Sequence, residues 1–120
     1  PCAEAGLLTD GIDAARATGA AIPALAVSDT VKRAGDDGRI IATVERTGLY
    51  LAQTPQVFRR DLLWKAYEGA ADPATDDAGL LERMGVAVQT YTGSPDNLKV
   101  TTPGDLERAA RILQARSVQA

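Results

Sequence analysis

Residues 20–27 read Ala-Ala-Ile-Pro-Ala-Leu-Ala-Val, and this run decides the fold of the chain. Both alternating sets of positions are apolar, which is typical of a strand covered on both faces. Pro23 is the exception, because a proline has no N–H to donate to a strand ladder. We therefore expect a buried strand that is disturbed in its middle.

Helical patterns flank this strand on both sides. Before it, Leu7, Leu8, Ile12 and Ala15 predict a helix that Gly19 would end. Three later helices are predicted. The first has apolar positions from Leu62 to Ala70 and is broken by Asp72-Pro73. The second begins at Thr75, Asp76 and Asp77 and ends at Met84 before Gly85, and the third begins at the N-cap Thr102. The last helix has the strongest start signal, with Pro103 at the first helical position and Asp105 three residues after the cap.

Shorter patterns predict the remaining strands. Residues 49–53, 86–91 and 98–101 are strand candidates, and residues 30–33 and 39–44 predict a hairpin around a turn at 34–38. Strands that alternate with helices indicate an α/β fold, a sheet sandwiched by helices, and we expect its strands to be parallel throughout. The hairpin has few large apolar residues, which favours a protruding arm over a core element.

Composition excludes several classes of function. The chain has 120 residues, 45% of them hydrophobic, and its 13 Lys and Arg are scattered among 16 Asp and Glu, which argues against nucleic acid as a partner. Cys2 has no second cysteine to pair with, and the chain has no histidine, the commonest general base and zinc ligand. No apolar run approaches the roughly 20 residues that cross a bilayer. We expect a cytoplasmic protein that does not bind membranes.

Two cations stand where a phosphate could dock. In a strand, the Lys99 side chain would face away from those of Leu98 and Val100, just before the helix that starts at Thr102, a geometry that favours an anion. The alternative is an exposed lysine on an edge strand. The planar guanidinium of Arg46 can bind two phosphate oxygens at once.

Acidic neighbours leave a second interpretation open for Arg46, an ordinary ion pair with Glu45, Asp36 or Asp37. Asp76 and Asp77 also have two interpretations, as a pair of metal ligands or as charges at a helix N-terminus. The second interpretation is favoured, because no further carboxylate or histidine lies at ligand spacing, and we assign no metal ligand in this chain.

Two threonines are candidate substrate contacts. Thr30 is expected to end the apolar strand, and ligands gather at the carboxyl ends of strands in open α/β sheets. Thr54 lies in Gln53-Thr54-Pro55-Gln56. The alternative for both hydroxyls is local hydrogen bonding in a turn. Gln53 and Gln56 are expected to shape their loop.

Five motifs, in chain order, resemble the second half of 2-C-methyl-D-erythritol 4-phosphate cytidylyltransferase. They are Ser28-Asp29-Thr30, Glu45-Arg46-Thr47-Gly48-Leu49, Gln53-Thr54-Pro55-Gln56, Thr75-Asp76-Asp77-Ala78 and Asp96-Asn97-Leu98-Lys99-Val100-Thr101-Thr102-Pro103. The resemblance spans nearly all 120 residues. It implies a Rossmann-like nucleotidyltransferase sheet, with residues 1–120 as the C-terminal portion of one cytidylyltransferase domain and a dimerisation arm at about 30–48.

The resemblance also implies an activity, the transfer of CMP from CTP to methylerythritol phosphate with release of pyrophosphate, in the non-mevalonate isoprenoid precursor pathway. Lys99 and Arg46 would hold the substrate phosphate, Thr30 and Thr54 would orient it, and Arg46 would reach the neighbour's site in a homodimer.

In the family the glycine loop that grips the nucleotide lies upstream of these motifs, and this chain contains no Gly-x-Gly-x-x-Gly and begins at Pro1 without an initiating Met. We therefore expect a fragment that is inactive alone, with no cofactor-binding residue, and with Mg²⁺ held mainly by CTP and the upstream half. The alternatives are a cytidylyltransferase for another polyol phosphate, such as ribitol 5-phosphate, and a non-catalytic dimerisation module.

Overall fold

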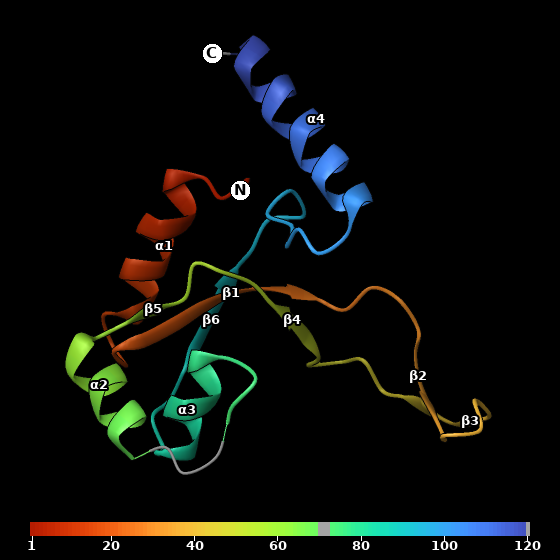
Figure 1. Cartoon of the computed structure of the whole chain (residues 1–120). Coiled ribbons are helices and arrows are strands. Elements are labelled where there is room, and N and C mark those ends of the chain that lie inside the picture. Colours follow the sequence, from red (N-terminus) through yellow and green to blue (C-terminus); the bar gives the residue numbers. More distant parts are fainter. Residues whose placement is uncertain (70–72, 120) are drawn as a thin grey trace.

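The computed structural model describes residues 1–69 and 73–119, and the predicted helix positions Ala70 and Asp72 lie outside this part of the chain. Its elements are α1 (Ala5–Ala15), β1 (Ala20–Ala26), β2 (Val31–Ala34), β3 (Ile40–Val44), β4 (Tyr50–Ala52), β5 (Val57–Phe58), α2 (Arg60–Glu68), α3 (Asp77–Arg83), β6 (Gln89–Thr92) and α4 (Pro103–Gln119). Figure 1 shows their arrangement, with the hairpin β2–β3 and the helix α4 extending away from the rest.

Strand β1 is the centre of the sheet and runs unbroken through Pro23, which is fully buried. β5 pairs with Ala20 and Ala21, and β4 pairs from Ala24 onward, so Pro23 lies between the two antiparallel ladders. Its carbonyl still accepts a hydrogen bond from the Gln53 N–H at 2.8 Å. The expected disturbance is therefore wrong, because the missing N–H falls where the ladder is already interrupted.

The sheet is mixed, and the expectation of an all-parallel sheet is wrong. β1 pairs in parallel only with β6, in a register that joins Ala21 to Gln89 and Ala24 to Thr92. β4 and β5 both run antiparallel to β1. The chain leaves β1, passes through the hairpin and returns directly alongside β1 without a crossover helix, and such a return gives an antiparallel pair.

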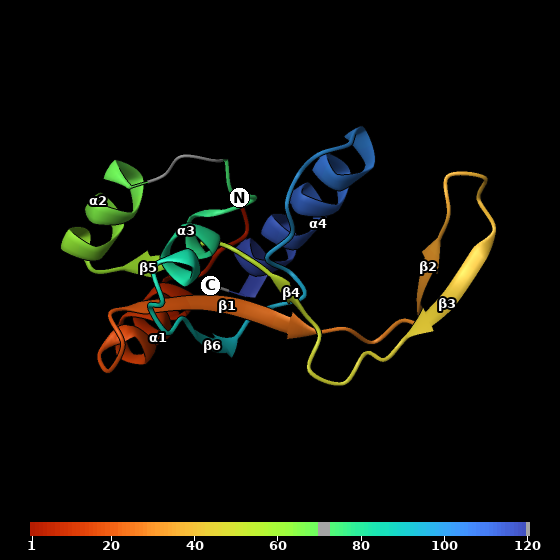
Figure 2. The same cartoon turned by 90° about the horizontal axis from the view of Figure 1, so that it is seen from below.

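Helices cover both faces of this sheet. In Figure 2, α1 lies on one face of β1, while α2 and α3 lie on the other. The core between β1 and the α2–α3 pair consists of Ala20, Ala66, Leu80 and Leu81, with Phe58, Leu62, Leu63, Ala74, Val86 and Val88 packed around them. The predicted sandwich of sheet and helices is thus confirmed. The predicted end of the first helix is also confirmed, since Gly19 adopts a φ of 81° and its N–H bonds the Ala15 carbonyl.

Strands β2 and β3 form a separate two-stranded sheet, paired from Val31 and Val44 at its base. Most of its residues are exposed, including Ile40 and Ile41 at 65% and 66%. Both views show this hairpin projecting from the body of the molecule (Figures 1 and 2). The predicted protruding hairpin is present, and an isolated two-stranded ribbon of this kind is marginally stable in water.

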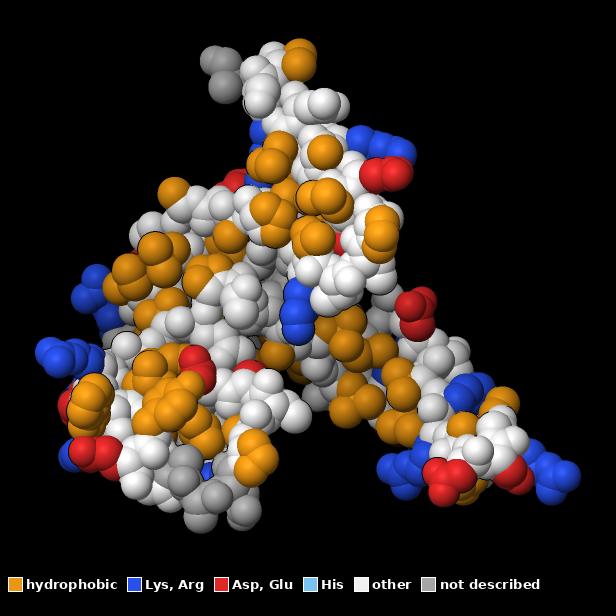
Figure 3. All heavy atoms as spheres, in the orientation of Figure 1, with side chains coloured by type: hydrophobic (Ala, Val, Ile, Leu, Met, Phe, Trp, Pro, Cys, Tyr) orange, Lys and Arg blue, Asp and Glu red, His pale blue; other side chains and the backbone are white. Residues whose placement is uncertain are grey.

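Helix α4 is tethered to the rest of the chain by Arg116. This side chain donates to the Cys2 carbonyl at 2.8 Å and pairs with Glu4 at 2.7 Å. Leu106 and Val118 of the same helix are 62% and 87% exposed. Apolar side chains gather visibly along α4 and near the base of the hairpin (Figure 3). Apolar side chains are therefore exposed on α4. Within residues 1–69 and 73–119, no helix is both long and apolar enough to cross a membrane.

Candidate functional site

Lys99 lies in an irregular segment that connects β6 to α4. The predicted strand at 98–101 is wrong, because no ladder forms there. Lys99 is exposed, and its ammonium group makes no hydrogen bond or ion pair with any residue that the structure describes. The cation is therefore available to an external anion.

The start of α4 fixes the segment on its C-terminal side. Thr102 is the N-cap, and its hydroxyl accepts the Asp105 N–H at 3.3 Å, as the sequence predicts. The Asp105 carboxylate bonds the N–H groups and the hydroxyls of both Thr101 and Thr102, at 2.8–3.1 Å. These bonds, the Thr102 hydroxyl first among them, lower the pKa of Asp105 to about 2.

This cap predicts a specific dependence of stability on acid. Because the pKa of Asp105 is lower in the folded state, its contribution is complete above the unfolded value near 4 and is lost as the pH falls through about 2. In thermal unfolding from pH 2 to pH 7, Asp105→Asn should lower the Tm by a constant amount above about pH 5. The gap should close between about pH 4 and pH 2, and a gap that stays constant to pH 2 would contradict this role.

Thr54 lies in the loop between β4 and β5, directly beside the Lys99 segment. The Thr54 carbonyl accepts a hydrogen bond from the Asn97 side-chain amide. The preceding residue, Gln53, donates to the carbonyls of Ser94 and Asn97 at 2.9 and 3.1 Å. The structure therefore brings the Thr54 loop and the Lys99 segment together. The prediction that Gln53 shapes this loop is confirmed.

The other end of the loop is tied to α3. Gln56 donates to the Asp76 carboxylate at 2.9 Å and accepts the Ala78 N–H at 3.3 Å. Asp76 is the N-cap of α3 and accepts the Gly79 N–H at 2.9 Å. The interpretation of Asp76 as a charge at a helix N-terminus is confirmed, with Asp76 as the cap and Asp77 in the first turn.

Arg46 and Thr30 lie at the base of the hairpin, on other connections than those that carry Thr54 and Lys99. The predicted position of Thr30 at the strand end is wrong, since β1 ends at Ala26 and Thr30 follows in an exposed connection. The Arg46 guanidinium donates to the Ser28 carbonyl. Thr30 and Arg46 lie on the two connections that enter and leave the hairpin, whose ladder begins with the Val31–Val44 pair.

The ion pair proposed as the alternative for Arg46 does not form among the described residues. Glu45 instead accepts the N–H and the hydroxyl of Thr47 at 3.0 and 2.9 Å, and these bonds, the N–H first, lower its pKa. Asp37 pairs with Arg39 at 3.6 Å. Arg46 remains exposed and keeps part of its guanidinium free for another acceptor.

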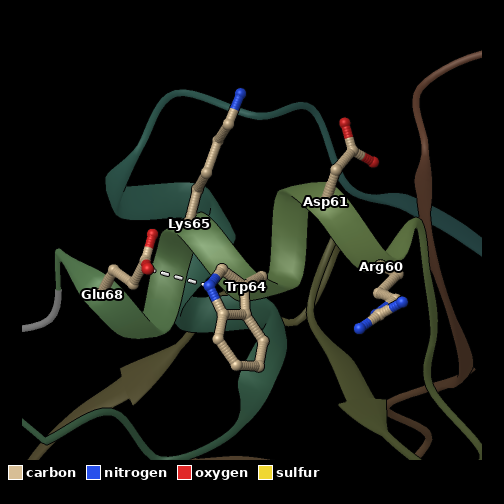
Figure 4. Close-up of a pocket in the computed structure, with 5 residues that line it drawn as sticks. All are labelled: Arg60, Asp61, Trp64, Lys65 and Glu68. Atoms are coloured by element: carbon tan, nitrogen blue, oxygen red, sulfur yellow. Dashed lines mark hydrogen bonds between the residues drawn. The ribbon is translucent and has the colours of Figure 1, made fainter.

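Two of the hollows on the described part of the chain are of interest here because they lie outside these groups of residues. One of about 320 Å³, at the carboxyl ends of β1 and β6, is lined by Ala24, Leu25, Ala26, Tyr50, Thr90, Tyr91 and Thr92. The other, of about 540 Å³, lies on the outer face of α2, where the Trp64 indole N–H donates to Glu68 at 2.8 Å (Figure 4). Neither hollow includes Thr30, Arg46, Thr54 or Lys99.

Sequence reasoning missed the part played by Asn97. This side chain is 8% exposed and is the buried polar residue of the described core. Its signal in the sequence is its place in the motif Asp96-Asn97-Leu98-Lys99, two residues before the candidate cation. Its buried contact with the Thr54 loop spans 43 positions and is invisible to local patterns.

The sequence of this chain is similar to those of known proteins. The family model described as IspD, 2-C-methyl-D-erythritol 4-phosphate cytidylyltransferase, matches residues 1–115. A protein of that name from Pelotomaculum thermopropionicum is 47% identical over 88% of this chain and 45% of its own length. A second, from Roseobacter denitrificans, is 44% identical over 97% of this chain and 52% of its own length.

Solved structures agree with the sequence matches. The crystal structure of 2-C-methyl-D-erythritol 4-phosphate cytidylyltransferase from Thermus thermophilus superposes with a TM-score of 0.85 and 33% identity, over 93% of this chain and 56% of that chain. The fold is thus that of an α/β nucleotidyltransferase. The chain belongs to the IspD family of cytidylyltransferases. It spans about half the length of the relatives just described.

Proposed function

We propose that the full protein transfers CMP from CTP to 2-C-methyl-D-erythritol 4-phosphate in isoprenoid precursor synthesis. The observation that carries this proposal is the Lys99 ammonium, which has no partner among the described residues and is held on a fixed segment beside the Thr54 loop. The name of the family supplies the substrates. We further propose that residues 1–120 are the C-terminal portion of a single cytidylyltransferase domain, with the arm at about 30–48.

In the proposed reaction, an oxygen of the substrate phosphate attacks the α-phosphorus of CTP. The new bond joins this oxygen to the α-phosphorus, the bond from the α-phosphorus to the bridging oxygen breaks, and pyrophosphate leaves with that oxygen. Two polyanions must approach each other, so charge neutralisation and positioning dominate the chemistry. Lys99 and Arg46 supply the positive charge, and the Thr30 and Thr54 hydroxyls orient the phosphate.

The separation of the two groups supports a composite site in a homodimer. Thr54 lies between β4 and β5 and Lys99 between β6 and α4, whereas Thr30 and Arg46 directly flank the strands of the hairpin β2–β3, which projects from the body of the molecule (Figure 1). We propose that Arg46 of one protomer enters the site formed around Lys99 of its partner. A closed two-fold dimer makes two such sites.

Mg²⁺ does not fit the described part of this chain. Within residues 1–69 and 73–119, no group of three or more carboxylates and thiolates lies close enough to hold a metal ion. The Asp76 carboxylate is already occupied as a helix cap. We assign Mg²⁺ to CTP and to the nucleotide-binding half of the family fold, and derive no step through it. We also propose that the protein acts in the cytoplasm.

Pyrophosphate release from CTP tests the proposal directly. We expect turnover with methylerythritol phosphate in the protein as its gene encodes it, and none in the 120-residue chain alone. Ribitol 5-phosphate is the comparison substrate. Preference for ribitol 5-phosphate would replace the substrate assignment, while no turnover with either compound would favour a non-catalytic dimerisation module.

A further inference from the structure

We propose that Asn97 is a positioning residue which, together with Gln53, fixes the Lys99 ammonium at its working distance from Thr54. This inference rests on the proposed function, because it assigns both ends of the connection to the substrate-phosphate site. Asn97 does not touch the substrate. It acts through Lys99, which lies two residues further along the chain.

The Asn97 side chain crosses from one candidate binding segment to the other. Its amide donates to the Thr54 carbonyl, and its own N–H donates to the Ser94 carbonyl at 3.0 Å. At 8% exposure, the amide is shielded from water. Thr54 itself is exposed, so the buried partner in this contact is the Asn97 amide, which needs a protein acceptor because little water reaches it.

Gln53 reinforces the same connection from the neighbouring position. Its carboxamide nitrogen bonds the carbonyls of Ser94 and Asn97, and its oxygen accepts the Ser94 N–H at 3.0 Å. The Gln53 amide nitrogen faces acceptors and its oxygen faces a donor, so a flipped amide would lose these hydrogen bonds. Gly93 leaves the space, since a Cβ at that position would overlap the Gln53 oxygen.

The far side of the segment is fixed as well. Helix α4 holds the turn before Lys99 through the Arg108 guanidinium, which donates to the Pro95 carbonyl at 3.3 Å, and through Arg116, which pairs with Asp96 at 3.6 Å. The Asp105 cap holds Thr101 and Thr102. Lys99 therefore lies on a few irregular residues that are anchored at both ends. Such a segment can hold a charge in place without belonging to a strand.

The consequence for catalysis is geometric. A change in the backbone at Asn97 would swing Lys99 away from the Thr54 hydroxyl without removing either group. Misplacement of a reacting phosphate by about 1 Å costs up to about 100-fold in rate. The loss should therefore depend on the presence of Lys99.

A double-mutant cycle in the protein as its gene encodes it tests this dependence. Asn97→Asp replaces the donor with an acceptor that faces the Thr54 carbonyl. We expect kcat/KM for methylerythritol phosphate to fall roughly 10- to 100-fold, and KM for CTP to stay within about twofold. In a Lys99→Ala background, the same change should cost less than about threefold.

Gln56→Glu is the matched control. It makes the same amide-to-carboxylate change in the same loop, but it breaks the contact with Asp76 of α3. In the double variant, the fold-loss in kcat/KM from Gln56→Glu should multiply with the fold-loss from Lys99→Ala. A cost of Asn97→Asp that also multiplies with that of Lys99→Ala would overturn the proposal, since Asn97 would then act on stability alone.

Amide hydrogen exchange separates this inference from the proposed function. If the unmodified protein does not turn over methylerythritol phosphate, the proposed function fails, and exchange still tests the positioning role. Residues 98–101 should exchange faster in Asn97→Asp than in Gln56→Glu, while α2 exchanges alike in the two variants. Equal exchange at 98–101 in the two variants would overturn the role, and Asn97→Ala replaces Asn97→Asp if the latter does not fold.

Discussion

Lys99→Ala and Arg46→Ala should each reduce kcat/KM for methylerythritol phosphate by about 1–3 kcal/mol, or roughly 5- to 150-fold, and leave CTP binding largely intact. Each replacement removes a charge-assisted bond to the substrate phosphate and spares the nucleotide. The steady-state kinetics of pyrophosphate release measure both effects. Lys65→Ala and Arg111→Ala are matched controls, because both cations are exposed and lie outside the candidate site and the arm.

Mixing the two impaired variants, Lys99→Ala and Arg46→Ala, tests whether the site is shared between protomers. If Arg46 enters the site of its partner, a heterodimer of Lys99→Ala with Arg46→Ala has one intact site and one site that lacks both cations. Random pairing at equal amounts then restores about a quarter of the unmodified activity.

Two outcomes would contradict the assignments. If both cations come from the same protomer, every site in the mixture lacks one of them, and activity stays at the level of the single variants. If either variant loses CTP and methylerythritol phosphate binding equally, its assignment to the substrate phosphate is wrong. Arg46→Lys adds a further distinction, since it keeps the charge but loses the planar fork.

Leu81→Ala should lower the free energy of unfolding by about 2–5 kcal/mol. The Leu81 side chain is 0% exposed and packs in the core between β1 and the α2–α3 pair, so its removal leaves a cavity. Chemical denaturation followed by circular dichroism measures the change in midpoint and slope.

A leucine in helix α4 provides the control for this prediction. Leu106 is 62% exposed, and in the 120-residue chain Leu106→Ala should change the free energy of unfolding by no more than about 0.5 kcal/mol. Equal losses at the two positions would contradict the core described here. A larger loss at Leu106 in the protein as its gene encodes it would indicate that further chain covers this face of α4.

Local chemistry made several elements predictable from sequence. The cap formed by Thr102 and Asp105 and the left-handed Gly19 depend on residues within a few positions of one another. The buried strand β1 and the hairpin that follows it also carry their patterns in short windows. The predictions of these features were correct because their hydrogen bonds and burial depend on the local order of residues.

The errors have a common physical cause. An apolar-polar alternation at 98–101 predicts a strand, but a strand forms only where a partner offers its ladder, and here the backbone is held instead by side chains. The expectation that all strands run parallel was wrong for a related reason. Direction depends on the path of the chain through the hairpin, which no short window records.

The sequence by itself determined the family, the α/β class, the helix caps and the identity of the candidate cations, because each is written in residues close together along the chain. Only the tertiary structure decided that Thr54 and Lys99 lie on joined segments while Arg46 lies apart on the hairpin. The contact between Asn97 and Thr54 joins residues 43 positions apart. Such contacts form only after the chain has folded around β1, since the buried amide needs the surrounding core to exclude water.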